Sequence, residues 1–135
     1  MSGRAEALHR IDDALSELGA IEASLAAARR GDRPGLDRGD LARRFQAIAH
    51  AGAGHHALAP VQELAALAEQ VTHGTDRNIL HTADGLEVVQ HAADVLSLLL
   101  RDTGFQLLGR RGADVTPAAI ALRQRLEHEL LGARR

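Results

Sequence analysis

Apolar side chains recur every three or four residues in several long stretches of the chain, and this spacing limits the fold more than any other feature. In an α-helix such positions share one face, which must be buried against another element. The pattern is plainest near the two ends of the chain, at Leu8, Ile11, Leu15, Leu18 and Leu25 and at Leu122, Leu126 and Leu130. No segment shows the sustained alternation typical of a half-buried β-strand. The sequence therefore predicts an all-α fold, an antiparallel four-helix bundle with an additional C-terminal fifth helix.

Capping and turn residues set the expected bounds of these helices. Asp37 or Asp40 is the expected N-cap of the second helix, and Pro60 should end that helix because a proline disfavours helical geometry at the preceding residue. Thr116 followed by Pro117 is a strong start signal for the last helix. The helices are expected at about residues 5–30, 41–59, 61–73, 80 (or 82)–102 and 116–132, with turns or loops at 31–39, 74–78 and 103–114.

Composition excludes several classes of function. The formal net charge is only -2, so we expect no binding to nucleic acid or to a membrane surface. The chain has no cysteine and no lysine, which removes thiolate metal sites and cysteine or lysine chemistry. We expect no signal peptide, because the first residues carry charges in place of an apolar run, and the longest apolar run, residues 95–100, is far too short to span a bilayer. We expect a single domain over residues 1–135, located in the cytoplasm.

Metal and nucleotide sites are not indicated either. Glu69 with His73, and Glu87 with His91, have the i, i+4 spacing of helical metal ligands, but isolated pairs of this kind are common by chance. We therefore expect no metal site. The chain also lacks a P-loop, a nucleophile-elbow motif and a dinucleotide-binding turn, so it has no ATP-binding pattern of its own.

His50 is the candidate functional residue. On a helical wheel it lies almost opposite Leu41, so its side chain should project away from the core. Gly52 and Gly54 each cost about 1 kcal/mol relative to alanine inside a helix. Two such residues beside an exposed histidine suggest that another surface approaches closely. The alternative is a surface histidine on a helix that happens to be rich in glycine and alanine.

The stretch that begins at His50 resembles the histidine-containing phosphotransfer domain, and most closely the N-terminal phosphoacceptor domain of chemotaxis-type histidine kinases. The residues that carry the resemblance to the H-x-x-K-G signature and its leucine-rich following helix are His50, Gly54, Ala57, Leu64, Leu67 and Val71. The resemblance implies a helical bundle in which His50 accepts a phosphoryl group from the catalytic domain of a histidine kinase. It also implies transfer to an aspartate on the receiver domain of a response regulator. ATP and Mg²⁺ would come from those partners, so no intrinsic cofactor is expected.

Two supporting residues depart from the family pattern. Ala53 stands where the family has a lysine near the phosphoryl oxygens, and Thr72 aligns with a glutamate that orients the imidazole. Glu69 lies one turn before Thr72 on the same face. Arg43 is a candidate replacement for the missing cation. Together with Glu69 and Thr72, Gln46 is a candidate for holding the ring.

These departures leave a second hypothesis open. The same fold would act as a phosphorylation-incompetent adaptor or dimerisation module. Loss of the lysine and of the orienting glutamate is expected in a domain that no longer needs to be phosphorylated. The apolar run at residues 95–100, VLSLLL, would then be a surface through which the chain forms a homodimer.

Overall fold

The computed structural model describes residues 2–31, 36–74, 83–110 and 114–133, and these residues are helical with no strand. The all-α prediction is confirmed for this part of the chain. Each expected helix has a counterpart, and the described helices are α1 (Ser2–Arg29), α2 (Arg38–Gly52), the short 3₁₀ helix η1 (His56–Leu58), α3 (Ala59–Gly74), α4 (Ala83–Leu107) and α5 (Thr116–Ala133).

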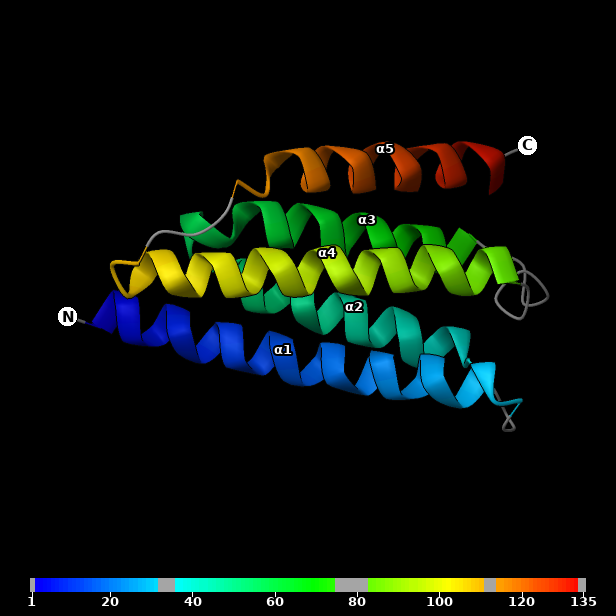
Figure 1. The fold of residues 1–135 in the computed structure, drawn as a ribbon, viewed down its shortest axis with the longest axis horizontal. Helices are drawn as coiled ribbons and strands as arrows, with labels where there is room; N and C mark the ends of the chain where they lie inside the picture. The colour runs from blue at the N-terminus through cyan, green and yellow to red at the C-terminus, as the bar shows by residue number, and fades with distance from the viewer. Residues whose placement is uncertain (1, 32–35, 75–82, 111–113, 134–135) are drawn as a thin grey trace.

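Successive helices run in alternating directions and form a bundle (Figure 1). α1 packs against α2 and α4, and α3 packs against the same two helices from the other side. α2 and α4 therefore occupy diagonal corners of the bundle. α5 lies along α3 and α4, at the top of the view in Figure 1. Within the described part of the chain, every helix falls short of the apolar length that a membrane crossing needs.

The apolar stripes meet in one core, to which every helix contributes. Each side chain of this kind stabilises the fold by about 1.5–3 kcal/mol through burial. The largest side chains with almost no exposed surface include Leu18, Ile21, Leu25, Phe45, Ile48, Leu64, Leu96, Leu100, Leu122 and Leu126. Leu122 and Leu126 belong to α5, so this helix is an integral part of the core.

The apolar run at residues 95–100 is mostly consumed inside the bundle. Val95, Leu96, Leu99 and Leu100 are buried, because α4 packs against α1, α3 and α5 at once. Leu98 is the exposed leucine of the run, at 43% exposure. The self-association surface expected from this run is thus reduced to one side chain.

The second helix ends earlier than its sequence predicts. Asp37 is its N-cap and accepts a hydrogen bond from the backbone N–H of Gly39 at 3.0 Å. Of the two predicted N-caps, Asp37 and Asp40, the structure uses Asp37. The expected end near Ala59 is wrong, because α2 stops at Gly52. His55 then takes an extended conformation (φ -143°, ψ 127°), and its Nδ1 accepts from the backbone N–H of Ala57 at 3.2 Å. This local hydrogen bond replaces the helical one and starts η1.

The fourth helix is longer than predicted. Residues 103–107 were expected to be a loop, but they continue α4 to Leu107. The chain leaves the helix two residues after Leu107, through Gly109, whose φ is +76°. The N–H of Arg110 donates to the carbonyl of Phe105 at 2.8 Å, which completes a Schellman motif. The predicted start at Leu80 or Thr82 lies outside the described residues, as does most of the loop expected at 74–78.

Candidate functional site

His50 lies in the last turn of α2 with its side chain exposed, as the helical wheel predicts. It borders an open groove of about 600 Å³ between α1 and α2. Among the described residues, no hydrogen bond or ion pair engages the imidazole ring. The groove is lined by Glu6, His9, Arg10, Asp13, Ser16 and Glu17 of α1 and by Ala47, His50 and Ala51 of α2. His50 therefore shares this groove with side chains of α1.

Arg10 of α1 reaches the end of the histidine helix. One terminal nitrogen of its guanidinium donates to the backbone carbonyl of His50 at 3.4 Å and to that of Ala51 at 3.3 Å. The other terminal nitrogen pairs with Glu6 at 3.0 Å. The last carbonyls of a helix lack the regular partner four residues later and carry a partial negative charge, so a guanidinium there is favourable. Arg10 thus caps α2 and places a cation at the base of His50.

Gly54 makes room for this cation. A Cβ at position 54 would lie 2.8 Å from Cζ of Arg10, which is closer than carbon atoms can pack. A Cβ at Gly52 would instead lie 3.1 Å from both the backbone nitrogen of Gln62 and the carbonyl oxygen of Leu58. The close approach expected at both glycines is therefore present within the molecule. One glycine accommodates α1, and the other accommodates the start of α3.

Of the residues on α2 that were predicted to assist His50, Gln46 and Ala53 lie near it and Arg43 does not. Arg43 is exposed and pairs with Asp40 at 2.8 Å, one turn further from His50. It precedes His50 by seven residues, or about 10 Å along the helix. Gln46 is exposed one turn before His50, and Ala53 is the exposed C-cap, whose N–H donates to the His50 carbonyl at 3.2 Å. Arg43 is thus engaged elsewhere, whereas Gln46 and Ala53 remain close to His50 on the helix.

Neither predicted support on α3 reaches His50. Gln62 lies against Gly52, at the level of the end of α2. Thr72 follows Gln62 by ten residues, a rise of about 15 Å away from that end. Thr72 is buried and donates to the carbonyl of Ala68 at 2.8 Å, and Glu69 lies 3.6 Å from His73. Among the described residues, neither Glu69 nor Thr72 forms a hydrogen bond or ion pair with the imidazole, and both have other partners.

Ion pairs fix α2 on α1 beside the groove. Arg44 pairs with Glu17 of α1 at 3.0 Å and with Asp40 at 3.1 Å. A hydrogen bond from Arg43 lowers the pKa of Asp40, Arg44 lowers it further, and burial opposes both. The pKa of Arg44 is raised, mainly by its hydrogen bond to Asp40 and to a smaller extent by its hydrogen bond to Glu17. These partly exposed pairs join α1 and α2 beside the groove.

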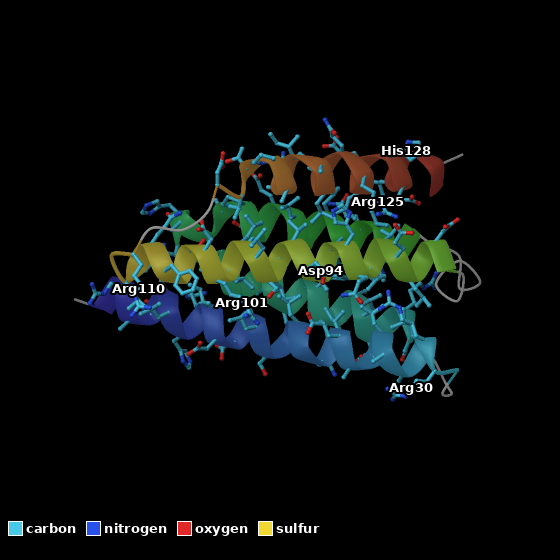
Figure 2. The ribbon with its side chains drawn as sticks, in the orientation of Figure 1. Arg30, Asp94, Arg101, Arg110, Arg125 and His128 are labelled. Atoms are coloured by element: carbon cyan, nitrogen blue, oxygen red, sulfur yellow. The ribbon has the colours of Figure 1, made fainter. Side chains whose placement is uncertain are left out.

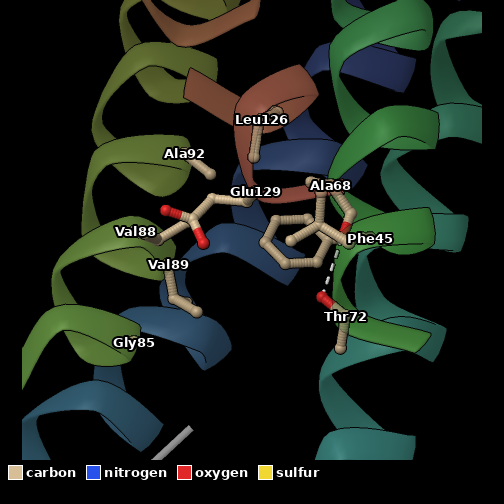
Figure 3. A pocket seen from close by; sticks show the side chains of 10 residues that line it. Phe45, Ala68, Thr72, Gly85, Val88, Val89, Ala92, Leu126 and Glu129 are labelled. Carbon is tan, nitrogen blue, oxygen red and sulfur yellow. Dashed lines mark hydrogen bonds between the residues drawn. The ribbon is translucent and has the colours of Figure 1, made fainter. Parts of the chain in front are cut away.

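A second cavity lies between α2, α3, α4 and α5. Figure 3 shows Phe45, Thr72, Val89 and Leu126 around it, with the carboxylate of Glu129 at its edge. It holds about 30 Å³, which is room for roughly one water. Ligand pockets usually measure about 300–1,000 Å³. This cavity is too small to hold a ligand, and the candidate site is the groove beside His50.

The structure brings no third potential metal ligand to the pairs Glu69–His73 and Glu87–His91 from among the described residues. In the described part of the chain, no three potential ligands come together. Glu87 lies 3.5 Å from Arg125 of α5, and the same guanidinium lies 3.4 Å from Nδ1 of His91. In Figure 2 Arg125 is labelled on α5, above α4. The pair on α4 is therefore engaged in the contact between α4 and α5.

The candidate site thus consists of an exposed imidazole and a guanidinium that two different helices bring to the same end of the groove. Sequence reasoning did not identify Arg10 as the cation beside His50, although Glu6 and Arg10 have the spacing of a helical ion pair. Its contact with α2 depends on how α1 packs, which no local pattern encodes. Comparison with protein-family models, with curated proteins and with solved structures gave no match to this chain.

Proposed function

We propose that this chain is a histidine phosphotransfer domain of a two-component or phosphorelay system, with His50 as the phosphoacceptor. The observation that carries the proposal is the exposed His50 in the last turn of α2, whose ring makes no hydrogen bond or ion pair among the described residues and whose backbone carbonyl contacts the Arg10 guanidinium. An antiparallel helical bundle with a fifth helix is also the arrangement that the resemblance implies. The exchange would take place in the cytoplasm, where ATP is available.

Two transfers make up the proposed cycle. A neutral imidazole nitrogen of His50 attacks the γ-phosphorus of ATP held by a kinase, the bond from phosphorus to the bridging oxygen breaks, and ADP leaves. An aspartate oxygen of a receiver domain then attacks the same phosphorus, and the phosphorus–nitrogen bond breaks to release the imidazole. The partners supply ATP, Mg²⁺ and further positive charge, while this chain supplies the nucleophile and an open docking face.

The test is phosphoryl transfer from histidine kinases and phosphorylated receivers of the source organism. The native protein and His50→Gln are assayed side by side, with His128→Gln as a matched control because His128 is also exposed but lies on α5. We expect an acid-labile label on the native protein and on His128→Gln, and none on His50→Gln. Equal absence of label on all three across the panel would refute the proposal.

A second candidate is an adaptor that binds partners without being phosphorylated. Ala53 in place of a lysine, and the distance of Thr72 from the end of α2, favour it. Under this hypothesis His50→Gln leaves partner binding intact, whereas under the first it abolishes signal transfer. Sedimentation equilibrium would show whether the adaptor is a homodimer.

A further inference from the structure

We infer that Arg10, from a helix other than the histidine helix, is the cation that contacts the phosphoryl group on His50. This inference rests on the proposed function. In this inference α1 supplies the positive charge near the phosphoryl oxygens that Ala53 of α2 lacks. Arg43, the candidate from the sequence, is paired with Asp40 two turns away.

The position of the guanidinium supports this assignment. Arg10 and His50 line the same groove, and the guanidinium lies within hydrogen-bond distance of the His50 carbonyl. An arginine presents five N–H donors in a planar fork, so it can keep a carbonyl on one edge and bind a phosphoryl oxygen on another. Gly54 leaves the space in which the guanidinium rests. No other cation of the described residues contacts the backbone of His50.

Glu6 competes with a phosphoryl group for the same guanidinium. Its carboxylate lies 3.0 Å from a terminal nitrogen of Arg10, and its side chain is 60% exposed. An exposed pair of this kind is weak and exchanges readily with solvent. A phosphoryl group carries more negative charge than a carboxylate and accepts hydrogen bonds on three oxygens. When His50 is phosphorylated, the donors of Arg10 should turn from Glu6 to the phosphoryl oxygens.

A donor that needs no partner protein tests the inference directly. Potassium phosphoramidate transfers its phosphoryl group to imidazole nitrogens. The phosphorus–nitrogen bond of the donor breaks, a new phosphorus–nitrogen bond to the ring forms, and ammonia leaves. Label at each histidine is followed by mass spectrometry of peptides kept at alkaline pH. The exposed His128 is present in every sample and serves as the internal reference.

Two substitutions isolate the charge of Arg10. Arg10→Gln and Arg10→Lys both lose the fork that caps α2, but only the lysine keeps the positive charge. We expect Arg10→Gln to label His50 about tenfold more slowly relative to His128, the effect of losing one charge-assisted hydrogen bond, and Arg10→Lys to recover most of that rate. Adding Ala53→Lys to Arg10→Gln should also restore it. Arg101→Gln, on the outer face of α4 (Figure 2), is the control for loss of any one arginine.

The outcomes separate the two proposals. If His50 is labelled equally fast in the native protein, Arg10→Gln and Arg10→Lys, the inference on Arg10 fails while the proposed function stands. If kinases and receivers leave the native His50 unlabelled, the proposed function fails. Should Arg10→Gln lose its helical circular dichroism, Glu6→Gln decides instead, because the exposed Glu6 can be changed without disturbing the core. Faster labelling or a longer phosphohistidine half-life in Glu6→Gln supports the inference, and unchanged values overturn it.

Discussion

Replacing Gly52 by alanine should destabilise the protein, although the same change usually stabilises a helix. The missing Cβ would lie 3.1 Å from two backbone atoms, the nitrogen of Gln62 and the oxygen of Leu58, neither of which can rotate away. Overpacking of this kind costs about 1–3 kcal/mol. The gain in helix propensity is at most about 1 kcal/mol, and it is smaller at the last residue of a helix. We expect a net loss of about 1–2 kcal/mol.

Gly19→Ala is the matched control. Gly19 lies inside α1, is exposed, and has nothing within 4 Å of its would-be Cβ. It should therefore gain about 0.5–1 kcal/mol. Thermal unfolding by circular dichroism should show the midpoint falling by about 3–8 °C for Gly52→Ala and rising by about 2–4 °C for Gly19→Ala. A Gly52→Ala protein as stable as the native one would refute the view that α2 and the start of α3 are in backbone contact at this point.

Three further predictions concern the ion pairs, the core and the site. Hydrogen bonds from Arg43 and Arg44 hold the pKa of the Asp40 carboxyl below its ordinary value, so the ionised carboxylate favours the folded state at higher pH. The stability advantage of the native protein over Asp40→Asn in urea unfolding should therefore shrink as the pH falls below about 4, and an advantage independent of pH would contradict this reasoning. Leu98→Gln should change stability by less than about 0.5 kcal/mol and leave the sedimentation behaviour unchanged, whereas Leu100→Ala should cost about 2–5 kcal/mol. Ala53→Lys should lengthen the lifetime of phosphorylated His50, measured as loss of acid-labile label, and an unchanged lifetime would remove the argument from the missing lysine.

The helices were predictable because their apolar spacing is strong and reports directly on which face is buried. The starts of α2 and α5 were also readable, because Asp37 and the Thr116–Pro117 pair act through local hydrogen bonds and fixed dihedral angles. The end of α2 was not. α2 ends at Gly52, where its backbone closely approaches Leu58 and Gln62 of a later segment, and a contact between segments leaves no periodic signal in either of them.

The same limitation applies to the site. Exposure of His50 follows from the helical wheel, which needs only the sequence of α2. The role of Thr72 was taken from an alignment that assumes a fixed register between α2 and α3. In this structure Thr72 faces the core beside Phe45 (Figure 3). Register depends on the length and path of the connecting segment, so a correct helix assignment can still place a side chain at the wrong end.

His50 lies near the end of α2, beside the first half of α1. His50 is only two residues from the end of its helix, so the residues of α3 at its level belong to the first turns of that helix. α1 runs antiparallel to α2, which brings its first half, with Glu6 and Arg10, beside the same end. A cation supplied from α1 does not depend on the sequence of α2. Position 53 then needs no positive charge and can be alanine. A substitution at Arg10 alone alters the surroundings of His50 without any change in the amino-acid sequence of α2.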